Sequence, residues 1–257
     1  MSSERSIFIT GAAAGIGAEI ARRFLNLGWR VGAYDIAEVD PALYPQTRGT
    51  LVTGKLDVTN VAQWEASLAE FCGVGGTLDV LVNNAGILFS GPFEESLVEK
   101  HQATINVNVN GTINGCHAAH EYLFRTKNAV VVNLCSASAI YGQPELASYS
   151  ASKFAIRGLT EALEIEWENQ DIRVLALWPL FVQTNMVVGM DTASTRSLGI
   201  NLGPEDVADE LIKAVLSPPR FAKVHYPVGG QAKVFANLAQ ISPGWANRLL
   251  NKKYASN

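Results

Sequence analysis

The chain has 257 residues, 48% of them hydrophobic, and carries a formal net charge of −4 at pH 7 with an isoelectric point near 5.6. This composition can bury one large core, so we expect a single domain over residues 1–257. The 20 basic residues are scattered and the net charge is mild, which argues against a nucleic-acid-binding protein.

A short apolar run at 6–10 predicts a buried strand, and a glycine-rich turn with Gly11, Gly15 and Gly17 follows it. Helical periodicity over 16–25 begins within this turn. Strand, turn and helix in direct succession point backbone N–H groups and the positive end of the helix dipole at the turn, which suits a pyrophosphate. A plain tight connection is the alternative interpretation of the turn.

The second predicted strand, 30–35, ends in Asp35, 24 residues after Gly11. An acidic residue at this distance in a dinucleotide-binding unit accepts hydrogen bonds from the adenosine ribose hydroxyls and repels a 2′-phosphate. The turn offers only alanines at 12–14, with no lysine or arginine for such a phosphate. We therefore expect NAD rather than NADP, unless Asp35 is an ordinary strand-end aspartate.

Strands and helices alternate along the rest of the chain. Further strands are predicted at 50–56, 78–82, 129–134, 173–177 and 224–228, and helices at 61–72, 98–127, 148–169 and 204–217. The alternation predicts an α/β fold with a parallel sheet and helices on both faces. In an open sheet of this kind a ligand lies over the carboxyl ends of the strands.

Tyr149 and Lys153 are four residues apart in a predicted helix, so their side chains share one face. A free tyrosine has a pKa of about 10. A nearby ammonium favours the phenolate, so we expect Lys153 to lower the pKa of Tyr149 and make an acid–base pair. Taken alone, the two residues would be a solvated or packing pair.

In their order and spacing over 6–186, these motifs resemble the classical short-chain dehydrogenase/reductase family. The motifs are Thr10-Gly11 with Gly15-Ile16-Gly17, then Asn83-Asn84-Ala85-Gly86, Asn108 with Gly111, Ser136, and Tyr149 with Lys153. The resemblance implies a single-domain Rossmann fold with a doubly wound, mostly parallel sheet. It also implies an NAD(P)-dependent alcohol dehydrogenase or carbonyl reductase that transfers a hydride between nicotinamide and substrate.

The resemblance assigns roles to four catalytic residues. Tyr149 is the implied general acid/base, and Ser136 is the implied hydrogen-bond partner of the reacting oxygen. Lys153 would also bond the nicotinamide ribose, and Asn108 would hold a water in a proton relay to Lys153. Asn106 and Asn110 compete for this last match, but the spacing to the following glycine favours Asn108.

The resemblance also supplies a set of cofactor contacts. The implied cofactor-binding residues are Gly11, Gly15, Ile16, Gly17, Asp35, Asp57, Val58, Asn83, Ala85, Gly86, Tyr149, Lys153, Pro179, Val182 and Thr184. A turn aspartate is the alternative for Asp57. Leu180 replaces the family's usual glycine, so its side chain must fill pocket volume or shift the loop.

The substrate segment is expected at 184–203, an apolar stretch without clear helical capping that suits a lid. Family analogy also places Phe89, Phe93, Ile140, Tyr141, Leu146 and Leu180 near the mouth. None of these residues is charged, so we expect a hydrophobic ketone or secondary alcohol, a class that includes bulky and aromatic compounds. An epimerase, isomerase or dehydratase holding NAD tightly, or a non-catalytic dinucleotide-binding sensor, are the alternatives.

The C-terminal extension, 231–257, has an amphipathic pattern broken at Pro243-Gly244. It is expected to pack on protein, with a subunit contact or a membrane surface as alternatives. The long helices around Asn108 and Tyr149 resemble those that pack against a second subunit in the family, which implies a homodimer or homotetramer.

The remaining signals concern compartment and metal. Three cysteines form no disulfide framework and no signal segment precedes the first strand, so a cytoplasmic location is expected. No apolar run reaches the 18 residues of a membrane span. The four histidines lack metal spacing, and no metal is expected.

Overall fold

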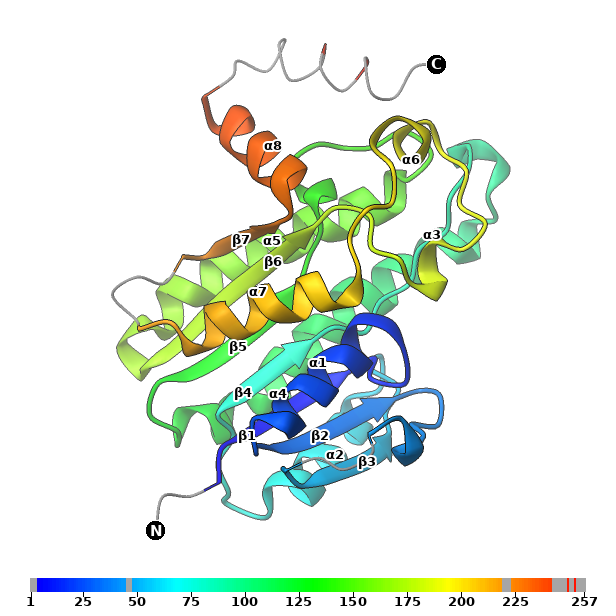
Figure 1. Ribbon diagram of the computed structural model, residues 1–257. Helices are drawn as coiled ribbons and strands as arrows, with labels where there is room; N and C mark the ends of the chain where they lie inside the picture. Colours follow the sequence, from blue (N-terminus) through cyan, green and yellow to red (C-terminus); the bar gives the residue numbers. More distant parts are fainter. Residues whose placement is uncertain (1–3, 45–47, 219–222, 242–248, 250–251, 253–257) are drawn as a thin grey trace.

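The computed structural model describes residues 4–44, 48–218, 223–241, 249 and 252. Seven strands form one sheet in the order β3-β2-β1-β4-β5-β6-β7, and every neighbouring pair is parallel (Figure 1). The strands are β1 Ser6–Thr10, β2 Arg30–Asp35, β3 Leu51–Lys55, β4 Val80–Asn83, β5 Ala129–Leu134, β6 Ile172–Pro179 and β7 His225–Val228. The doubly wound parallel sheet predicted from the sequence is confirmed.

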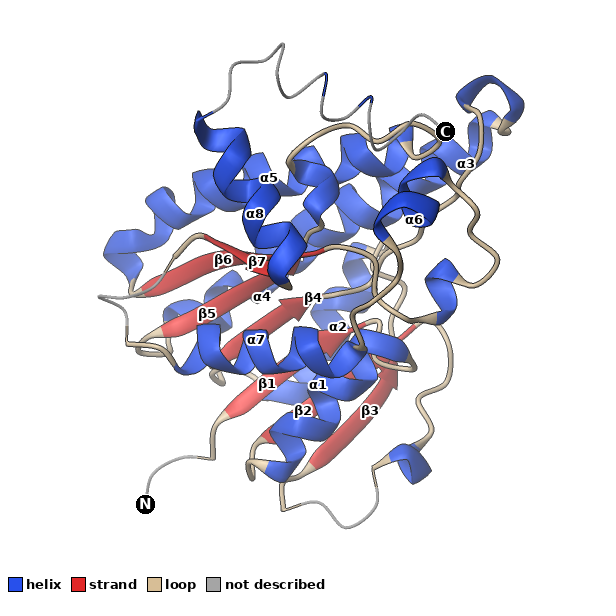
Figure 2. Cartoon of the chain, turned by 45° about the horizontal axis from the view of Figure 1, so that its top comes forward, coloured by secondary structure: helices blue, strands red, loops and turns tan. Residues whose placement is uncertain are grey.

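Helices cover both faces of the sheet (Figure 2). The helices α1 Gly15–Asn26 and α7 Pro204–Leu216 lie on one face, and α2 Val61–Cys72, α4 Gly111–Phe124 and α5 Ala147–Trp167 lie on the other. Successive side chains of a strand point to opposite faces. Accordingly Ile7 and Ile9 of β1 enter the core under α1 and α7, while Phe8 enters the core under α2 and α4.

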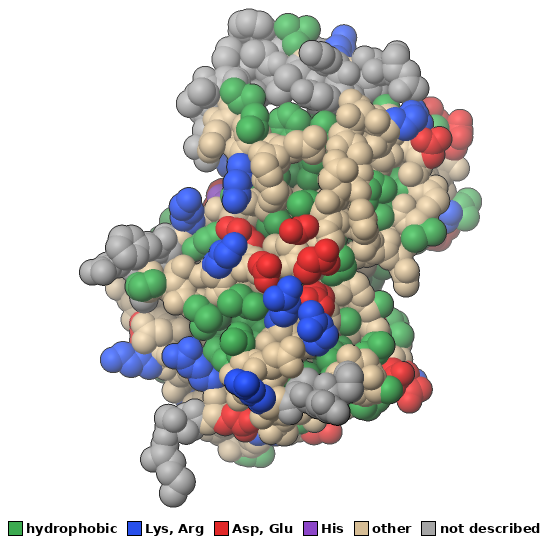
Figure 3. Space-filling model, in the orientation of Figure 1, with side chains coloured by type: hydrophobic (Ala, Val, Ile, Leu, Met, Phe, Trp, Pro, Cys, Tyr) green, Lys and Arg blue, Asp and Glu red, His purple; other side chains and the backbone are tan. Residues whose placement is uncertain are grey.

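The outer surface of α1 and α7 is charged with both signs (Figure 3). Arg23 of α1 pairs with Glu19 one turn earlier, at 2.7 Å, and with Asp209 of α7, at 3.0 Å. Because these pairs are solvent-exposed, each contributes little stability. They match the amphipathic pattern that predicted both helices.

The predicted helix 98–127 is interrupted in the structure. It consists of α3 Val98–Ile105, a π-helical turn Asn106–Asn110 and α4, which ends at Phe124. A single π turn inside an α-helix is uncommon and is frequent at functional sites. Hydrophobic periodicity does not register one extra residue per turn, so the sequence pattern indicated one continuous helix.

The chain between β6 and α7 also differs from expectation. Residues Ala193–Leu198 form a short helix, α6, with a capping box between Thr192 and Thr195. The usual capping box has Glu or Gln at the third helical position. Threonine occupies that position here, and the sequence analysis therefore missed the helix.

The last described helix, α8, spans Gly230–Ile241. Its Phe235 and Ala236 are buried against the body of the protein. The predicted break at Pro243-Gly244 lies outside the described residues. Within the described ranges, no helix is both long and apolar enough to cross a bilayer, and no group of His, Cys, Asp and Glu side chains is arranged to hold a metal ion.

Candidate active site

A cavity of about 360 Å³ lies across the carboxyl ends of the strands. Residues at or just after the ends of six strands line it, namely Gly11, Asp35, Leu56, Asn84, Leu134 and Pro179. The strand order reverses between β1 and β4, and in such sheets the adjoining loops diverge to leave a crevice. The pocket therefore lies where the sequence placed it.

The glycine turn forms one end of the pocket. Gly11 and Gly15 adopt left-handed conformations with φ of +66° and +56°, which disfavour other residues. Gly11, Gly15 and Ile16 line the cavity. Gly17 does not, because it packs inward: a Cβ there would lie 2.1 Å from the Gly11 carbonyl oxygen. Gly17 thus shapes the turn for a ligand without facing it.

Asp35 lines the same end of the pocket and braces the turn. Its Oδ2 accepts a hydrogen bond from the backbone N–H of Ala13 at 2.9 Å, and its Oδ1 accepts one from Ala37 at 3.0 Å. Among the described lining residues, Lys153 is the only lysine or arginine, and it belongs to the opposite end. The Asp35 end therefore carries negative charge without a basic partner for a phosphate.

Asp57 and Val58 also line the pocket. Asp57 Oδ1 accepts hydrogen bonds from the backbone N–H and the hydroxyl of Thr59, at 2.9 and 2.7 Å. Asp57 therefore closes the turn before α2 and also borders the cavity. Its contact with an adenine stays a prediction.

The structure separates the members of the Asn83-Asn84-Ala85-Gly86 motif. Ala85 and Gly86 line the pocket, but Asn83 does not. Strand alternation turns Asn83 into the core, where its Nδ2 donates to Asn133 Oδ1 at 2.9 Å. Asn84 lines the pocket instead and donates to the carbonyl oxygens of Thr10 and Gly11, at 2.9 Å each. The structure therefore places Asn84, and not the predicted Asn83, in the wall of the pocket.

Ser136, Tyr149 and Lys153 converge at the other end of the pocket. Ser136 follows β5, and one face of α5 carries the other two. Lys153 Nζ lies 5.4 Å from the centre of the Tyr149 ring and donates to the Leu134 carbonyl oxygen at 2.8 Å. Tyr149 shares a hydrogen bond with Ser136. Three groups that can exchange or hold protons thus meet beside one cavity.

The protonation of Tyr149 differs from the expectation. Burial raises the pKa of the Tyr149 phenol well above its usual range, and the hydrogen bond with Ser136 opposes this rise only in part. Burial also lowers the pKa of Lys153. The predicted lowering of the Tyr149 pKa by Lys153 is not found, because desolvation dominates and the Lys153 ammonium is directed at a carbonyl oxygen. The phenol is therefore neutral at pH 7.

Asn108 sits in the π-helical turn and does not line the pocket. Its Oδ1 accepts from the Ile87 N–H at 2.8 Å, and its Nδ2 donates to the Ile87 carbonyl and to Ser152 Oγ, both at 3.0 Å. The side chain thus ties the segment after β4 to the helical turn between Tyr149 and Lys153. These contacts show a clamp; the water relay stays a prediction.

Pro179, Val182 and Thr184 line the pocket as expected. Leu180 lines it too, and it packs in an apolar cluster with Tyr149 and Phe181. Of the two possibilities for a side chain in place of glycine, the structure shows that Leu180 fills pocket volume.

The Tyr149 end of the cavity is apolar. Its walls include Leu88, Leu180, Phe181, Met186 and Val187. Phe89 and Phe93, which were expected near the mouth, are exposed and do not line the cavity. Ile140, Tyr141 and Leu146 belong to the apolar cluster packed around Phe181 and Tyr149, behind this wall. Ser138, in a short 3-10 helix, and Gln143, in the loop after it, also line the pocket, and no periodic pattern in the sequence indicated them.

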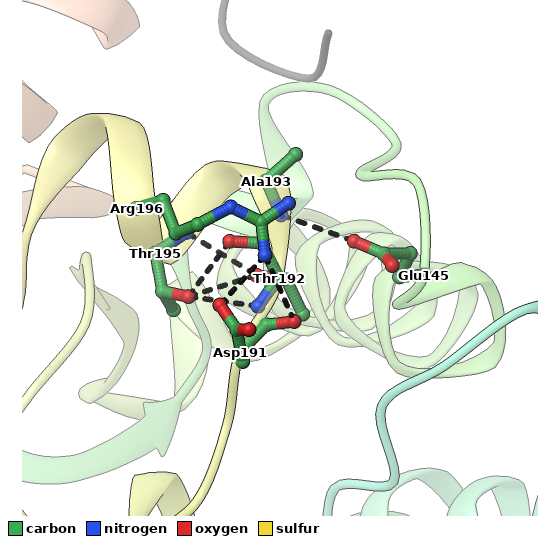
Figure 4. A network of polar contacts seen from close by, with 6 residues as sticks. All are labelled: Glu145, Asp191, Thr192, Ala193, Thr195 and Arg196. Carbon is green, nitrogen blue, oxygen red and sulfur yellow. Dashed lines mark hydrogen bonds and ion pairs between the residues drawn. The ribbon is translucent and has the colours of Figure 1, made fainter. Parts of the chain in front are cut away.

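The helix α6 is anchored to the loop before α5 (Figure 4). Glu145, in the loop before α5, reaches across so that its Oε2 accepts a hydrogen bond from the Ala193 N–H at 3.0 Å. Leu198 of α6 packs with Leu146. Glu145 holds a left-handed conformation, φ +62°, which non-glycine residues seldom adopt. Its carboxylate joins two loops that are 48 residues apart in sequence.

Residues 5–194 match the sequence profile of the short chain dehydrogenase family. The chain belongs to this family. One relative is a 3alpha-hydroxysteroid dehydrogenase of Mediterraneibacter gnavus, 33% identical over 227 residues that cover 82% of this chain and 90% of that protein. As a short chain dehydrogenase, the chain is an oxidoreductase of a family that uses nicotinamide dinucleotides.

Two solved structures of short chain dehydrogenases are similar. The protein from Burkholderia cenocepacia, in complex with NADP, is 22% identical with a TM-score of 0.82 and covers 99% of this chain and 98% of that one. The protein from Mycobacterium paratuberculosis, bound to NAD, is 25% identical with a TM-score of 0.79. The match covers 89% of this chain and 98% of that one. The similarity to the Burkholderia protein supports the fold. The two solved structures contain different dinucleotides, NADP in one and NAD in the other.

Proposed function

We propose that this short chain dehydrogenase is an NAD(H)-dependent carbonyl reductase or alcohol dehydrogenase acting on hydrophobic ketones or secondary alcohols. One observation carries the proposal: Ser136, Tyr149 and Lys153 meet at the apolar end of a cavity whose other end is the glycine turn with Asp35. A dinucleotide laid along the cavity would bring its reactive ring to the three side chains.

The residues present fit such a cofactor. Gly11 and Gly15 leave a cradle at the amino end of α1, where N–H groups and the helix dipole favour a pyrophosphate. Asp35 would accept the ribose hydroxyls and disfavour a 2′-phosphate, which supports NAD over NADP. Val58 and Asp57 would border the adenine, and Pro179, Val182 and Thr184 the nicotinamide. A bound nicotinamide would supply or accept the hydride at the substrate carbon.

Tyr149 would carry the proton. In reduction, its hydroxyl donates a proton to the carbonyl oxygen as the carbonyl carbon gains a hydride, and Ser136 donates a hydrogen bond to the same oxygen. In oxidation both transfers reverse. Because burial raises the pKa of Tyr149, the protonated form that reduction needs is the resting form. The Lys153 ammonium would stabilise the tyrosinate left after proton donation and contact the ribose, and Asn108 would hold the clamp beneath it.

NADH consumption across aliphatic, aromatic, steroidal and sugar carbonyls, with NADPH in parallel, tests the proposal. Tyr149→Phe is expected to lower turnover at least about 100-fold, which is the rate enhancement that a general acid contributes, while NADH binding is retained. Reduction by the unmodified enzyme should be flat between about pH 6 and 9, while oxidation rises with pH as the deprotonated fraction of Tyr149 grows.

Three outcomes would contradict parts of the proposal. Retained turnover in Tyr149→Phe would remove the acid/base role, and activity confined to short charged keto acids would remove the hydrophobic substrate class. A tightly held nucleotide without net turnover of free NADH would indicate an epimerase, isomerase or dehydratase instead.

We also infer a homo-oligomer in a reducing compartment. The helices α3, α4 and α5 expose large apolar side chains, among them Val98, Ile113, Phe154 and Ile165, and such surfaces favour contact with another subunit. All three cysteines are free thiols in the structure. Light scattering after size-exclusion chromatography measures the assembly, and a monomeric mass would contradict it.

A further inference from the structure

Gln143 is a buried amide in the wall of the pocket. Its residue is 2% exposed and lines the cavity, and its Oε1 is buried without a hydrogen-bond partner. Other described side chains with a buried polar atom that lacks such a partner, namely those of Tyr34, Asn83, Arg173, Trp178 and His225, do not line the pocket. A buried acceptor left unpaired is costly, so its retention in a ligand cavity points to a donor that a ligand brings.

The protein holds Gln143 firmly relative to Tyr149. The Gln143 N–H donates to Ser150 Oγ at 3.0 Å, and its carbonyl oxygen accepts from the Leu146 N–H at 3.2 Å. Ser150 is the neighbour of Tyr149 in α5, and the Ser150 N–H donates to the Leu146 carbonyl at 2.8 Å. The loop carrying the amide is therefore bonded to the turn of helix that carries the phenol.

Ser136 and Lys153, at the same end, are already engaged in hydrogen bonds within the chain. Ser136 Oγ donates to Ser138 Oγ and accepts from the Ser138 N–H, both at 3.1 Å. Lys153 Nζ donates to the Leu134 carbonyl. Leu88, Leu180 and Phe181 supply apolar wall. A ligand in this part of the cavity thus meets a largely hydrophobic surface beside the buried, unpaired oxygen of Gln143.

We propose that Gln143 determines substrate specificity by accepting a hydrogen bond from a second polar group of the substrate. The substrate class is then an uncharged, largely apolar ketone or secondary alcohol with an additional hydroxyl or N–H group away from the reacting carbon. An analogue that lacks the donor leaves the buried oxygen unpaired, and sites built on such a contact reject that analogue strongly. A carboxylate there places negative oxygen against the carbonyl oxygen, which disfavours keto acids. This inference rests on the proposed function, because it extends the site of Ser136 and Tyr149.

Matched ketones test the contact. Cyclohexanones substituted at carbon 3 or 4 with hydroxyl, methoxy or methyl have similar size, and the hydroxyl compound alone donates a hydrogen bond. We expect kcat/KM with NADH to favour the best hydroxyl compound over its methoxy and methyl analogues at least about ten-fold. In Gln143→Met this ratio should fall toward one. In Gln143→Glu, which keeps an acceptor, a preference for the hydroxyl compound should persist.

The matched control is Gln102→Met, because Gln102 is exposed on α3 and lies outside the pocket lining. Its hydroxyl-to-methyl ratio should equal that of the unmodified enzyme. Circular dichroism and thermal melting show whether each variant is folded. If Gln143→Met does not fold, two measurements carry the test. They are the hydroxyl-to-methyl ratio of kcat/KM in Gln143→Glu and the hydroxyl-to-methoxy ratio of the unmodified enzyme.

The failures of the two proposals are distinguishable. Turnover with equal use of the three substituents, or an unchanged ratio in Gln143→Met, overturns the role of Gln143 and leaves the oxidoreductase function in place. If no carbonyl is turned over with NADH or NADPH, the proposed function fails. Saturation-transfer NMR of the same ketones then tests Gln143 by binding alone. A preference for the hydroxyl ketone that is lost in Gln143→Met supports the contact. Equal binding of the hydroxyl, methoxy and methyl ketones to the unmodified protein overturns it.

Discussion

The two ends of the pocket are built in different ways. At the dinucleotide end, one contiguous segment, 11–17, and the tip of the next strand supply the glycine turn and Asp35, which bond to each other. At the substrate end, side chains come from separate loops around Leu88, Gln143 and Leu180. The comparison teaches that the first end depends on backbone conformation within one supersecondary unit, whereas the second depends on how distant loops pack.

The largest effect is expected from a substitution that adds a side chain within the glycine turn. A Cβ in Gly17→Ala would meet the Gly11 carbonyl at 2.1 Å, so the turn or the helix must shift. Overpacking of this kind costs about 1–3 kcal/mol. We expect NADH affinity, measured by fluorescence titration, to fall by about 10- to 100-fold.

The control for the glycine turn is Gly158→Ala in α5. An added Cβ there meets nothing within 4 Å, and alanine favours helix, so cofactor affinity should be unchanged and thermal stability equal or higher. If both substitutions weaken NADH binding equally, the close packing at Gly17 is not what shapes the site.

A smaller effect is expected at Asp35. Asp35→Asn keeps an acceptor for the Ala13 N–H and removes the charge, so it separates the shape of the turn from electrostatic repulsion. We expect the kcat/KM ratio of NADPH to NADH to rise about five-fold, as about 1 kcal/mol of repulsion is relieved.

Asp57→Asn is the matched control, because Asp57 is another carboxylate of the same pocket. An equal rise in both variants would mean that the total negative charge, and not Asp35, selects the cofactor. A rise of the NADPH-to-NADH ratio in Asp35→Asn alone would support the view that the glycine turn and Asp35 by themselves select the cofactor.

The smallest effect is expected at the substrate end, where a single contact joins two loops. Glu145→Ala removes the acceptor of the Ala193 N–H at the start of α6. Loss of one hydrogen bond of about 0.5–1.5 kcal/mol should raise the KM of a ketone about 3- to 10-fold and leave the KM of NADH unchanged. Glu145→Gln keeps an acceptor and should change the ketone KM less.

Asp191→Asn serves as the control for Glu145, since the pair of Asp191 with Arg196 lies on the exposed side of α6. Its kinetics should match those of the unmodified enzyme. Equal changes in the KM values of ketone and NADH in Glu145→Ala would show that α6 serves both ends, and the division between them would not hold.

Sequence patterns placed most residues of the glycine-turn end at the pocket and missed several at the Tyr149 end, for a physical reason. Gly11, Gly15 and Asp35 act through local backbone geometry, which a few residue types at set spacings determine. Phe89 and Phe93 were expected near the mouth and do not line the cavity, while Gln143 was not expected and is buried in its wall. The orientation of a loop side chain depends on contacts with other loops, and no period in the chain encodes those contacts.

By itself, the sequence determined the parallel sheet, the glycine turn and the proximity of Tyr149 to Lys153, because strand alternation and the helical repeat are properties of short segments. The tertiary structure decided that Asn83 faces the core and that Asn108 clamps Ile87 from a π-helical turn. It also decided that Tyr149 remains protonated. Burial sets these outcomes, and burial is created only when separate segments close over one another.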